Sequence, residues 1–206
     1  MDTKKDYSQL ASDIVIEKTI KALIKNNINA IVVNSGSEAK ASTLQYVKSG
    51  SEVMNMSSQT LDSIGLTQEF TTSRHYLSVK NALMGMDDNT QGIAKRRLGS
   101  AQEWAVGSVH AITEDGVICV ASNTGSQLPA YAYGAQNVLL IVGTQKIVKD
   151  LDAAFDRIYN YCFPLENTRL QRLYNIPSGV NKVLIINKEV VPGRISVMFV
   201  KEKLGF

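Results

Sequence analysis

Hydrophobic residues near the start of the chain follow first a helical and then a strand-like pattern. Between Leu10 and Ile24 they recur every three or four positions, which predicts an amphipathic helix over residues 8–26 that packs on the core. Residues 30–33 are a continuous aliphatic run, typical of a strand covered on both faces. Ser35 and Glu38 have the spacing of a capping box, so a second helix should begin here and extend to about Val47.

The middle of the chain is mainly helical in pattern. A weak strand is predicted at residues 53–56, and Ser58 is a candidate N-cap for a short helix over residues 59–64. Asp88 and Gln91 again have the capping-box spacing, and they open a longer helix that should carry Trp104. We therefore interpret residues 68–104 as a helical insertion rather than a separate domain.

The second half of the chain contains clearer strand signals. The apolar runs 109–112 and 117–120 flank an Asp-Gly turn and predict a hairpin. Residues 138–142 form the most continuous apolar strand, and apolar residues at helical spacing from Ile147 to Cys162 predict a helix that Pro164 terminates. The runs 183–186 and 195–200 flank a Pro-Gly turn and should form a closing β-hairpin.

These elements predict a single α/β domain over residues 1–206. Alternating strands and helices favour a three-layer architecture, in which an open, mixed, mostly parallel sheet has helices on both faces and ends in the C-terminal β-hairpin. Ligands of such sheets bind beyond the carboxyl ends of the strands. Candidate chemistry is therefore expected in the loops that follow the strands.

Composition narrows the function classes. The 206 residues include 22 Lys plus Arg and 19 Asp plus Glu, a net charge of +3 that does not favour nucleic-acid binding. No apolar run approaches the roughly 18 residues of a membrane span, and the N-terminus lacks the pattern of a signal peptide, so we expect a cytoplasmic protein without a membrane partner. Cys119 and Cys162 are far apart and lack Cys-x-x-Cys spacing, which predicts no metal site.

Two loops combine glycine with hydroxyl and amide side chains directly after a predicted strand. A helix N-terminus offers free amide groups and a partial positive charge, so such loops can bind phosphate or carboxylate. The same residue types also serve simply to cap helices, which is the alternative explanation. The candidate ligand-binding residues are Asn34, Ser35, Gly36 and Ser37 in the first loop, and Asn123, Thr124, Gly125, Ser126 and Gln127 in the second.

Other polar residues give weaker indications. Neither G-x-G-x-x-G nor a P-loop motif is present, so no nucleotide cofactor is predicted. His110 alternates with apolar neighbours, which favours a packed role over that of a general base. Glu114 is a candidate catalytic base or nucleophile. Arg169 could either pair with Glu166 on a helix surface or bind a ligand carboxylate.

Several segments together resemble the lactate-utilisation (LUD) domain family over nearly the whole chain. They are the run at residues 30–33 with its SGSEA loop, GSVHAITEDGVICVASNTGSQLP, VLLIVGTQKIV, PLENTR and NKVLIINKEVVPGRISVMFVKEKLGF. The resemblance implies a domain of the NagB/RpiA/CoA-transferase-like type. Bacterial members of the family act in the conversion of L-lactate to pyruvate beside iron–sulfur subunits.

The position of the loop over residues 122–127, between a buried strand and a helix, predicts that the protein binds a small anionic metabolite there, a carboxylate or phosphate, and the resemblance places this binding in lactate or organic-acid metabolism. Thr124, Gly125 and Ser126 match the Thr-Gly-Ser type of phosphate loop that is common in the wider superfamily. One alternative is a sugar-phosphate isomerase or a CoA-transferase-like enzyme that uses Glu114. The other is a non-catalytic subunit that partners an iron–sulfur protein. Whether the protein is an enzyme, and whether it forms a homo-oligomer, both stay open.

Overall fold

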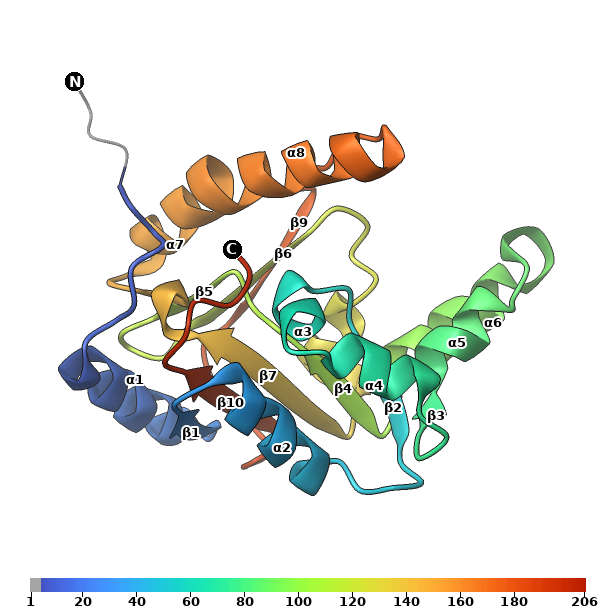
Figure 1. Cartoon of the computed structure of the whole chain (residues 1–206), viewed down its shortest axis with the longest axis horizontal. Helices are drawn as coiled ribbons and strands as arrows, with labels where there is room; N and C mark the ends of the chain where they lie inside the picture. Colours follow the sequence, from blue (N-terminus) through green and yellow to red (C-terminus); the bar gives the residue numbers. More distant parts are fainter. Residues whose placement is uncertain (1–4) are drawn as a thin grey trace.

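The computed structural model describes residues 5–206 and contains two β-sheets that lie face to face (Figure 1). The larger sheet has six strands, and all its neighbours are parallel. Its order is β1 (Asn29–Val33), β10 (Ile195–Val200), β7 (Asn137–Gly143), β4 (Trp104–Gly107), β2 (Glu52–Asn55) and β3 (Leu77–Ser78). The predicted α/β class and mostly parallel sheet are therefore confirmed.

The smaller sheet has four strands and mixed directions. The predicted hairpin forms its centre, where β5 (Ala111–Thr113) and β6 (Ile118–Ser122) pair antiparallel. The strand order is β8 (Ile147–Val148), β5 (Ala111–Thr113), β6 (Ile118–Ser122) and β9 (Lys182–Ile186). This sheet occupies much of the face of the larger sheet where helices were expected, so it adds a layer to the predicted arrangement.

Helices cover the outer faces of both sheets (Figure 1). α2 (Gly36–Tyr46), α3 (Gln59–Ser63) and α4 (Leu66–Thr72) pack on the larger sheet. α7 (Leu151–Arg157) and the π-helical turn η3 (Ile158–Cys162) pack on the smaller one. The remaining helical segments are α1 (Asp13–Lys25), α5 (Val79–Met84), α6 (Asp88–Ser100), η1 (Ala130–Gly134), η2 (Thr144–Lys146) and α8 (Phe163–Tyr174).

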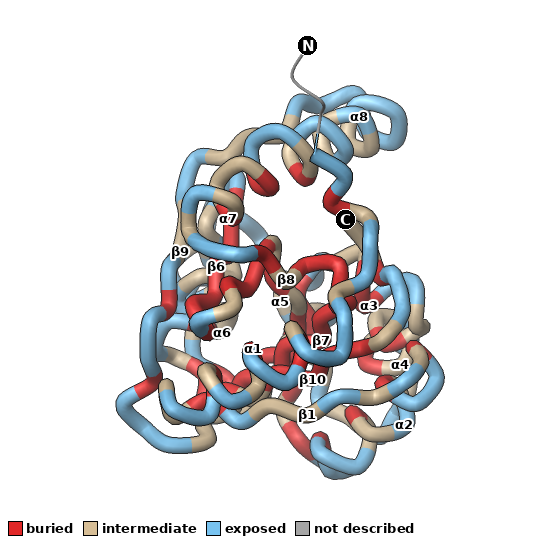
Figure 2. The backbone as a smooth tube through the Cα atoms, turned by 90° about the vertical axis from the view of Figure 1, so that its left-hand side faces the viewer, coloured by how far each residue is buried: buried red, intermediate tan, exposed pale blue. Residues whose placement is uncertain are grey.

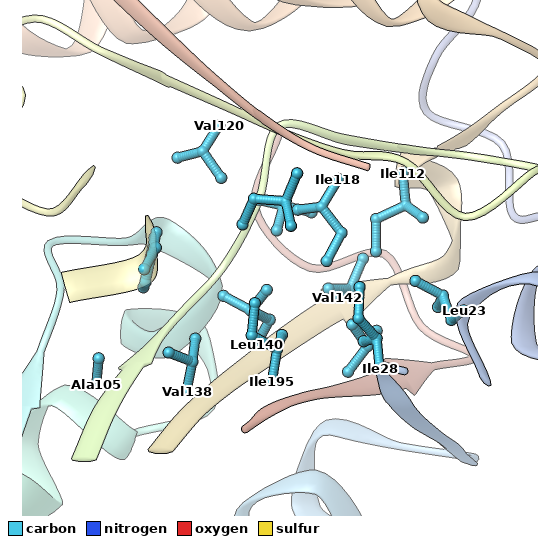
Figure 3. Close-up of a cluster of buried hydrophobic side chains, with 14 of the residues drawn as sticks. Leu23, Ile28, Ala105, Ile112, Ile118, Val120, Val138, Leu140, Val142 and Ile195 are labelled. Atoms are coloured by element: carbon cyan, nitrogen blue, oxygen red, sulfur yellow. The ribbon is translucent and has the colours of Figure 1, made fainter. Parts of the chain in front are cut away.

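The main hydrophobic core lies between the two sheets (Figure 3). Val138, Leu140 and Val142 of β7 face Ile112 and Ile118 of the smaller sheet, and all five are at most 1% exposed. The alternate β7 residues face α2–α4 on the other side of the larger sheet. β7 is thus buried on both faces, as its continuous apolar run predicts. Figure 2, coloured by burial, shows β7 in red, whereas α6 and α8 have no buried residue.

Three local predictions differ from the structure. The helix that begins at Asp88 ends at Ser100, and Trp104 starts β4 instead, because the short run Trp-Ala-Val fills the sheet between β2 and β7. Residues 147–148 form β8 rather than the start of a helix. Pro164 does not end the helical segment but lies in the first turn of α8, where its missing N–H is tolerated.

The two C-terminal strands are both present but do not pair with each other. β10 is inserted between β1 and β7, whereas β9 pairs antiparallel with β6 in the other sheet. The difference follows from their side chains, because β10 is almost wholly buried and suits a central parallel strand, while β9 is only partly buried and suits an edge. The predicted C-terminal hairpin is corrected to two neighbouring strands in different sheets.

The segment predicted as an insertion, residues 68–104, contains most of α4 and then β3, α5 and α6. α6 has no buried residue, and Figure 1 shows it extending away from the sheets beside α5. Within residues 5–206, no helix combines the length and the apolar character that crossing a membrane requires.

Candidate functional site

A cleft of about 550 Å³ opens at the carboxyl ends of the parallel strands β2, β4 and β7. Its walls are formed by residues 56–60 after β2, residues 108–110 after β4, the end of β6 with its following loop, and one side of η3 and α8. This is the edge at which ligands bind in open parallel sheets. The position of the cleft agrees with the expectation from the sequence.

Lys146 lines the cleft and is only 3% exposed. It follows β7 by three residues, in η2, and its Nζ donates hydrogen bonds to Thr60 Oγ1 at 2.9 Å and Ser108 Oγ at 3.1 Å. Ser108 directly follows β4, and Thr60 lies in α3, the helix that follows β2. The three residues therefore come from the segments after the neighbouring strands β7, β4 and β2. Burial, with a smaller contribution from the Arg157 charge, lowers the pKa of Lys146 from 10.5 to about 7.

His110 is held as a neutral side chain in the same wall. Its Nδ1 accepts a hydrogen bond from the backbone N–H of Ala121 at 3.1 Å, which leaves the proton of the neutral ring on Nε2. Burial, and then the charges of Lys146 and Arg157, lower the pKa of His110 to about 3. A ring with so low a pKa cannot accept a proton near neutral pH, which agrees with the packed role expected from the sequence.

Tyr131 and Cys162 are two further buried groups that line the cleft. The Tyr131 hydroxyl lies against Gly107, where a Cβ atom would be only 1.7 Å away, so the close approach requires glycine. Burial raises the pKa of the Tyr131 hydroxyl well above its ordinary range. Burial also raises the pKa of the Cys162 thiol, although Arg157 and Lys146 partly oppose this effect. Both groups therefore stay protonated near neutral pH.

Arg157 lies behind the cleft wall and is fully buried. Its Nη1 donates to Cys162 Sγ at 2.7 Å and to the His110 carbonyl, while Nε and Nη2 have no hydrogen-bond partner among the described residues. Its guanidinium carbon lies 5.2 Å from the ring centroid of Tyr161. No ion pair in residues 5–206 includes Arg157 or Lys146, so this side of the cleft carries buried basic groups without a carboxylate to balance them.

The second predicted loop lies at the cleft, but its backbone does not have the predicted form. The side chains of Asn123, Thr124, Ser126 and Gln127 line the cleft. The Gly125 amide, however, donates to Ser122 Oγ at 2.8 Å, and the Ser126 amide donates to Thr124 Oγ1 at 3.3 Å. These amides are not free because neighbouring hydroxyls bind them, and the segment leads into the π-helical η1 rather than an α-helix.

The first predicted loop lies away from the cleft. Ser35 caps α2 by accepting a hydrogen bond from the Glu38 amide, and Asn34 and Ser37 also bond within this turn. The Gly36 amide donates to Glu202 Oε2 at 2.7 Å, so a carboxylate of the chain itself occupies this helix N-terminus. Asn34, Ser35 and Ser37 therefore take part in the capping turn, the Gly36 amide is bound by Glu202, and none of the four residues lines the cleft.

Two charged candidates have different surroundings. Glu114 does not line the cleft, and its carboxylate lies 2.7 Å from Lys18 Nζ on α1. Arg169 does line the cleft, but both its Nε and Nη2 donate to Glu166 at 2.7 Å. The bidentate pair agrees with the helix-surface interpretation and leaves Arg169 at the rim of the cleft.

The sequence did not single out Lys146, Thr60, Ser108 or Tyr131. The available signal was position, because Lys146 and Ser108 come within three residues of the carboxyl end of a buried strand. Their convergence depends on the strand order, which the sequence does not specify. In the part of the chain that the structure describes, no group of three or more His, Cys, Asp or Glu side chains is arranged to hold a metal ion.

Comparisons with known proteins agree with this architecture. A family model described as LUD domain matches residues 16–200. Among solved structures, a DUF162 family protein from Deinococcus radiodurans superposes with a TM-score of 0.58 at 9% identity, covering 93% of this chain and 99% of that chain. The low identity means that this likeness supports the fold alone. No curated protein matches the chain.

Proposed function

Because the chain belongs to the LUD domain family, whose model covers residues 16–200, we propose that its cleft binds a small anionic metabolite of lactate or organic-acid metabolism. The observation that carries the proposal is Lys146, a buried amine in the cleft wall without a carboxylate partner among residues 5–206. A buried charge without an opposite charge costs several kcal/mol. An anion in the cleft would remove this cost by pairing with the lysine.

Other groups of the cleft support an anionic ligand. Arg157, directly behind the wall, adds a second buried positive charge, and in a low-dielectric interior its field acts over several ångströms. Thr60 and Ser108 place hydroxyls beside Lys146, and Asn123, Thr124, Ser126 and Gln127 supply a polar rim. Carboxylates and phosphates both suit such a combination of one cation and several hydrogen-bond donors.

Thermal unfolding of the wild-type protein with added ligands tests this proposal. Lactate, pyruvate, a sugar phosphate and a CoA ester should be compared with sodium chloride at the same ionic strength and with the neutral amide of lactate. At a concentration one hundred times the dissociation constant, a ligand stabilises the folded state by about 2.7 kcal/mol. We expect at least one anion to raise the melting temperature, and the neutral amide to have no such effect.

A pair of lysine variants shows whether the effect belongs to the cleft. Lys146→Met should abolish the stabilisation by the anion, whereas Lys149→Met, which changes an exposed lysine three residues away, should keep it. Equal responses of the two variants would place the anion elsewhere. Absence of any shift in the wild-type protein would contradict anion binding itself.

A further inference from the structure

We propose that Lys146 is a nucleophile that forms an imine with the carbonyl carbon of a small 2-oxo acid bound in the cleft. This inference rests on the function proposed above, since the same site takes the anion. It adds that the ligand carries a carbonyl group next to its negative charge and that binding includes a reversible covalent bond.

The hydrogen bonds of Lys146 favour this role. A neutral lysine amine has two N–H groups and one lone pair, and Thr60 and Ser108 accept one hydrogen bond each. Thr60 is fixed as an acceptor toward the lysine because its own hydroxyl hydrogen is donated to the Leu204 carbonyl at 3.2 Å. With both N–H groups bound in this way, the lone pair of the amine is left without a partner.

The surroundings of Lys146 keep a large part of the amine neutral. Burial and the neighbouring Arg157 lower its pKa from 10.5 to about 7, so near neutral pH the lone pair that attack requires is present in a far larger share of molecules than it would be for an exposed lysine. Three other titratable groups that line the cleft, His110, Tyr131 and Cys162, do not take up this proton near neutral pH. His110 has a pKa of about 3, and burial raises the pKa values of Tyr131 and Cys162.

The reaction balances with groups that the cleft provides. The Lys146 lone pair forms the C–N bond, and the π electrons of the C=O bond move to the oxygen. One proton then moves from nitrogen to oxygen, giving a carbinolamine. Loss of the hydroxyl with a second proton, as water, leaves the C=N bond of the imine. Ser108 can relay protons between nitrogen and oxygen, and the O–H of Tyr131, which also lines the cleft and stays protonated, can donate a hydrogen bond to the departing hydroxyl.

A 2-oxo acid fits this arrangement better than an aldehyde without charge. Its carboxylate lies one bond from the reacting carbon, so it would remain within the positive potential of the buried Arg157 while the carbonyl meets Lys146. The corresponding 2-hydroxy acid has the same charge and almost the same shape but lacks an electrophilic carbon. It should therefore bind without forming a bond.

Reductive trapping tests the proposal with pyruvate and lactate as a matched pair. The full-length protein is incubated with either compound and with borohydride, and intact mass spectrometry followed by peptide mapping locates any adduct. We expect one pyruvate adduct, on Lys146, and none with lactate. Lys149→Met should be labelled like the wild type and Lys146→Met should not, while Thr60→Val and Ser108→Ala should be labelled more slowly.

The outcomes separate this inference from the function on which it rests. If pyruvate and lactate both raise the melting temperature but pyruvate leaves no adduct on Lys146, the imine is wrong and anion binding stands. Adducts spread over exposed lysines, with Lys146 unlabelled in the mapped peptides, would overturn it in the same way. If no anion of the panel, pyruvate and lactate included, changes the melting temperature and no adduct forms, both proposals fail. Mapping in the wild-type protein decides even if a variant does not fold.

Discussion

Replacing Lys146 by methionine should change how the stability of the protein depends on pH. The folded protein lowers the pKa of Lys146 from 10.5 to about 7. One unit of pKa difference corresponds to about 1.4 kcal/mol, so placing the charged amine in the folded protein costs about 5 kcal/mol relative to the unfolded chain. Methionine has a similar length and carries no charge to bury, so its variant does not have this cost.

The sign follows from proton binding in the two states. Between pH 7 and 10.5 the unfolded chain holds the Lys146 proton more tightly than the folded protein does, so the stability of the wild type rises with pH across this window. At and below about pH 7 both states are protonated and the full cost is present. Lys146→Met lacks this contribution. It should therefore be more stable than the wild type near pH 6, by about 2–4 kcal/mol once two hydrogen bonds of about 1 kcal/mol each are subtracted.

Urea unfolding at intervals from pH 6 to pH 10 measures this difference. The advantage of the variant should shrink with rising pH and reverse by about 1–2 kcal/mol near pH 10, where the neutral lysine still bonds both hydroxyls. Lys149→Met, an exposed control, should give a curve parallel to that of the wild type. If the curves for Lys146→Met and the wild type are also parallel, Lys146 does not have the depressed pKa on which our description of the cleft depends.

Three further changes test other parts of the site. Glu114→Gln should leave the response to anions unchanged and lower the free energy of unfolding by less than about 1 kcal/mol, because it removes only a partly exposed ion pair with Lys18. If the variant no longer responds to anions in thermal unfolding, Glu114 takes part in ligand binding. Between pH 6.5 and 3 the unfolded chain takes up a proton at His110 that the folded protein, with a His110 pKa of about 3, does not, so the wild type loses stability as the pH falls. His110→Asn should lose less stability over this range. Denaturant titration measures the free energy of unfolding, and an equal dependence on pH in variant and wild type would contradict the low pKa of His110. Gly107→Ala should destabilise the folded protein by about 1–3 kcal/mol or displace the Tyr131 side chain, because the added methyl group overlaps the Tyr131 hydroxyl. A melting temperature equal to that of the wild type would contradict this close contact.

The strands were predicted best where burial is uniform along the run. The apolar residues 138–142 define β7, which is covered on both faces and lies at the centre of the larger sheet. The similar run at residues 30–33 also forms a strand, but β1 is at the sheet edge and Val32 is 40% exposed. An aliphatic run therefore identified strands without revealing their place in the sheet, because that place depends on partners far away in the chain.

Pairing and helix boundaries were predicted less well for the same reason. The Pro-Gly turn at residues 192–193 was interpreted as a hairpin, yet β9 and β10 belong to different sheets. A local turn fixes only where the chain bends, whereas β6 and β7 decide which strand each segment joins. Similarly, the helical spacing from residue 147 onward predicted a helix at residues 147–148, but these two residues pair with β5 as a parallel strand.

The candidate site illustrates the limit most directly. Residue types alone indicated the Thr124–Ser126 loop, and the structure places its side chains at the cleft although its Gly125 and Ser126 amides are already bonded. The strongest chemical feature instead comes from Lys146, Thr60 and Ser108, none of which belongs to a recognisable motif. These residues are separated by up to 86 positions and meet only because β7, β4 and β2 are neighbours in that order. A buried lysine is unusual only in its folded surroundings. The strand order therefore had to be known before Lys146 could be distinguished from the other lysines of the chain.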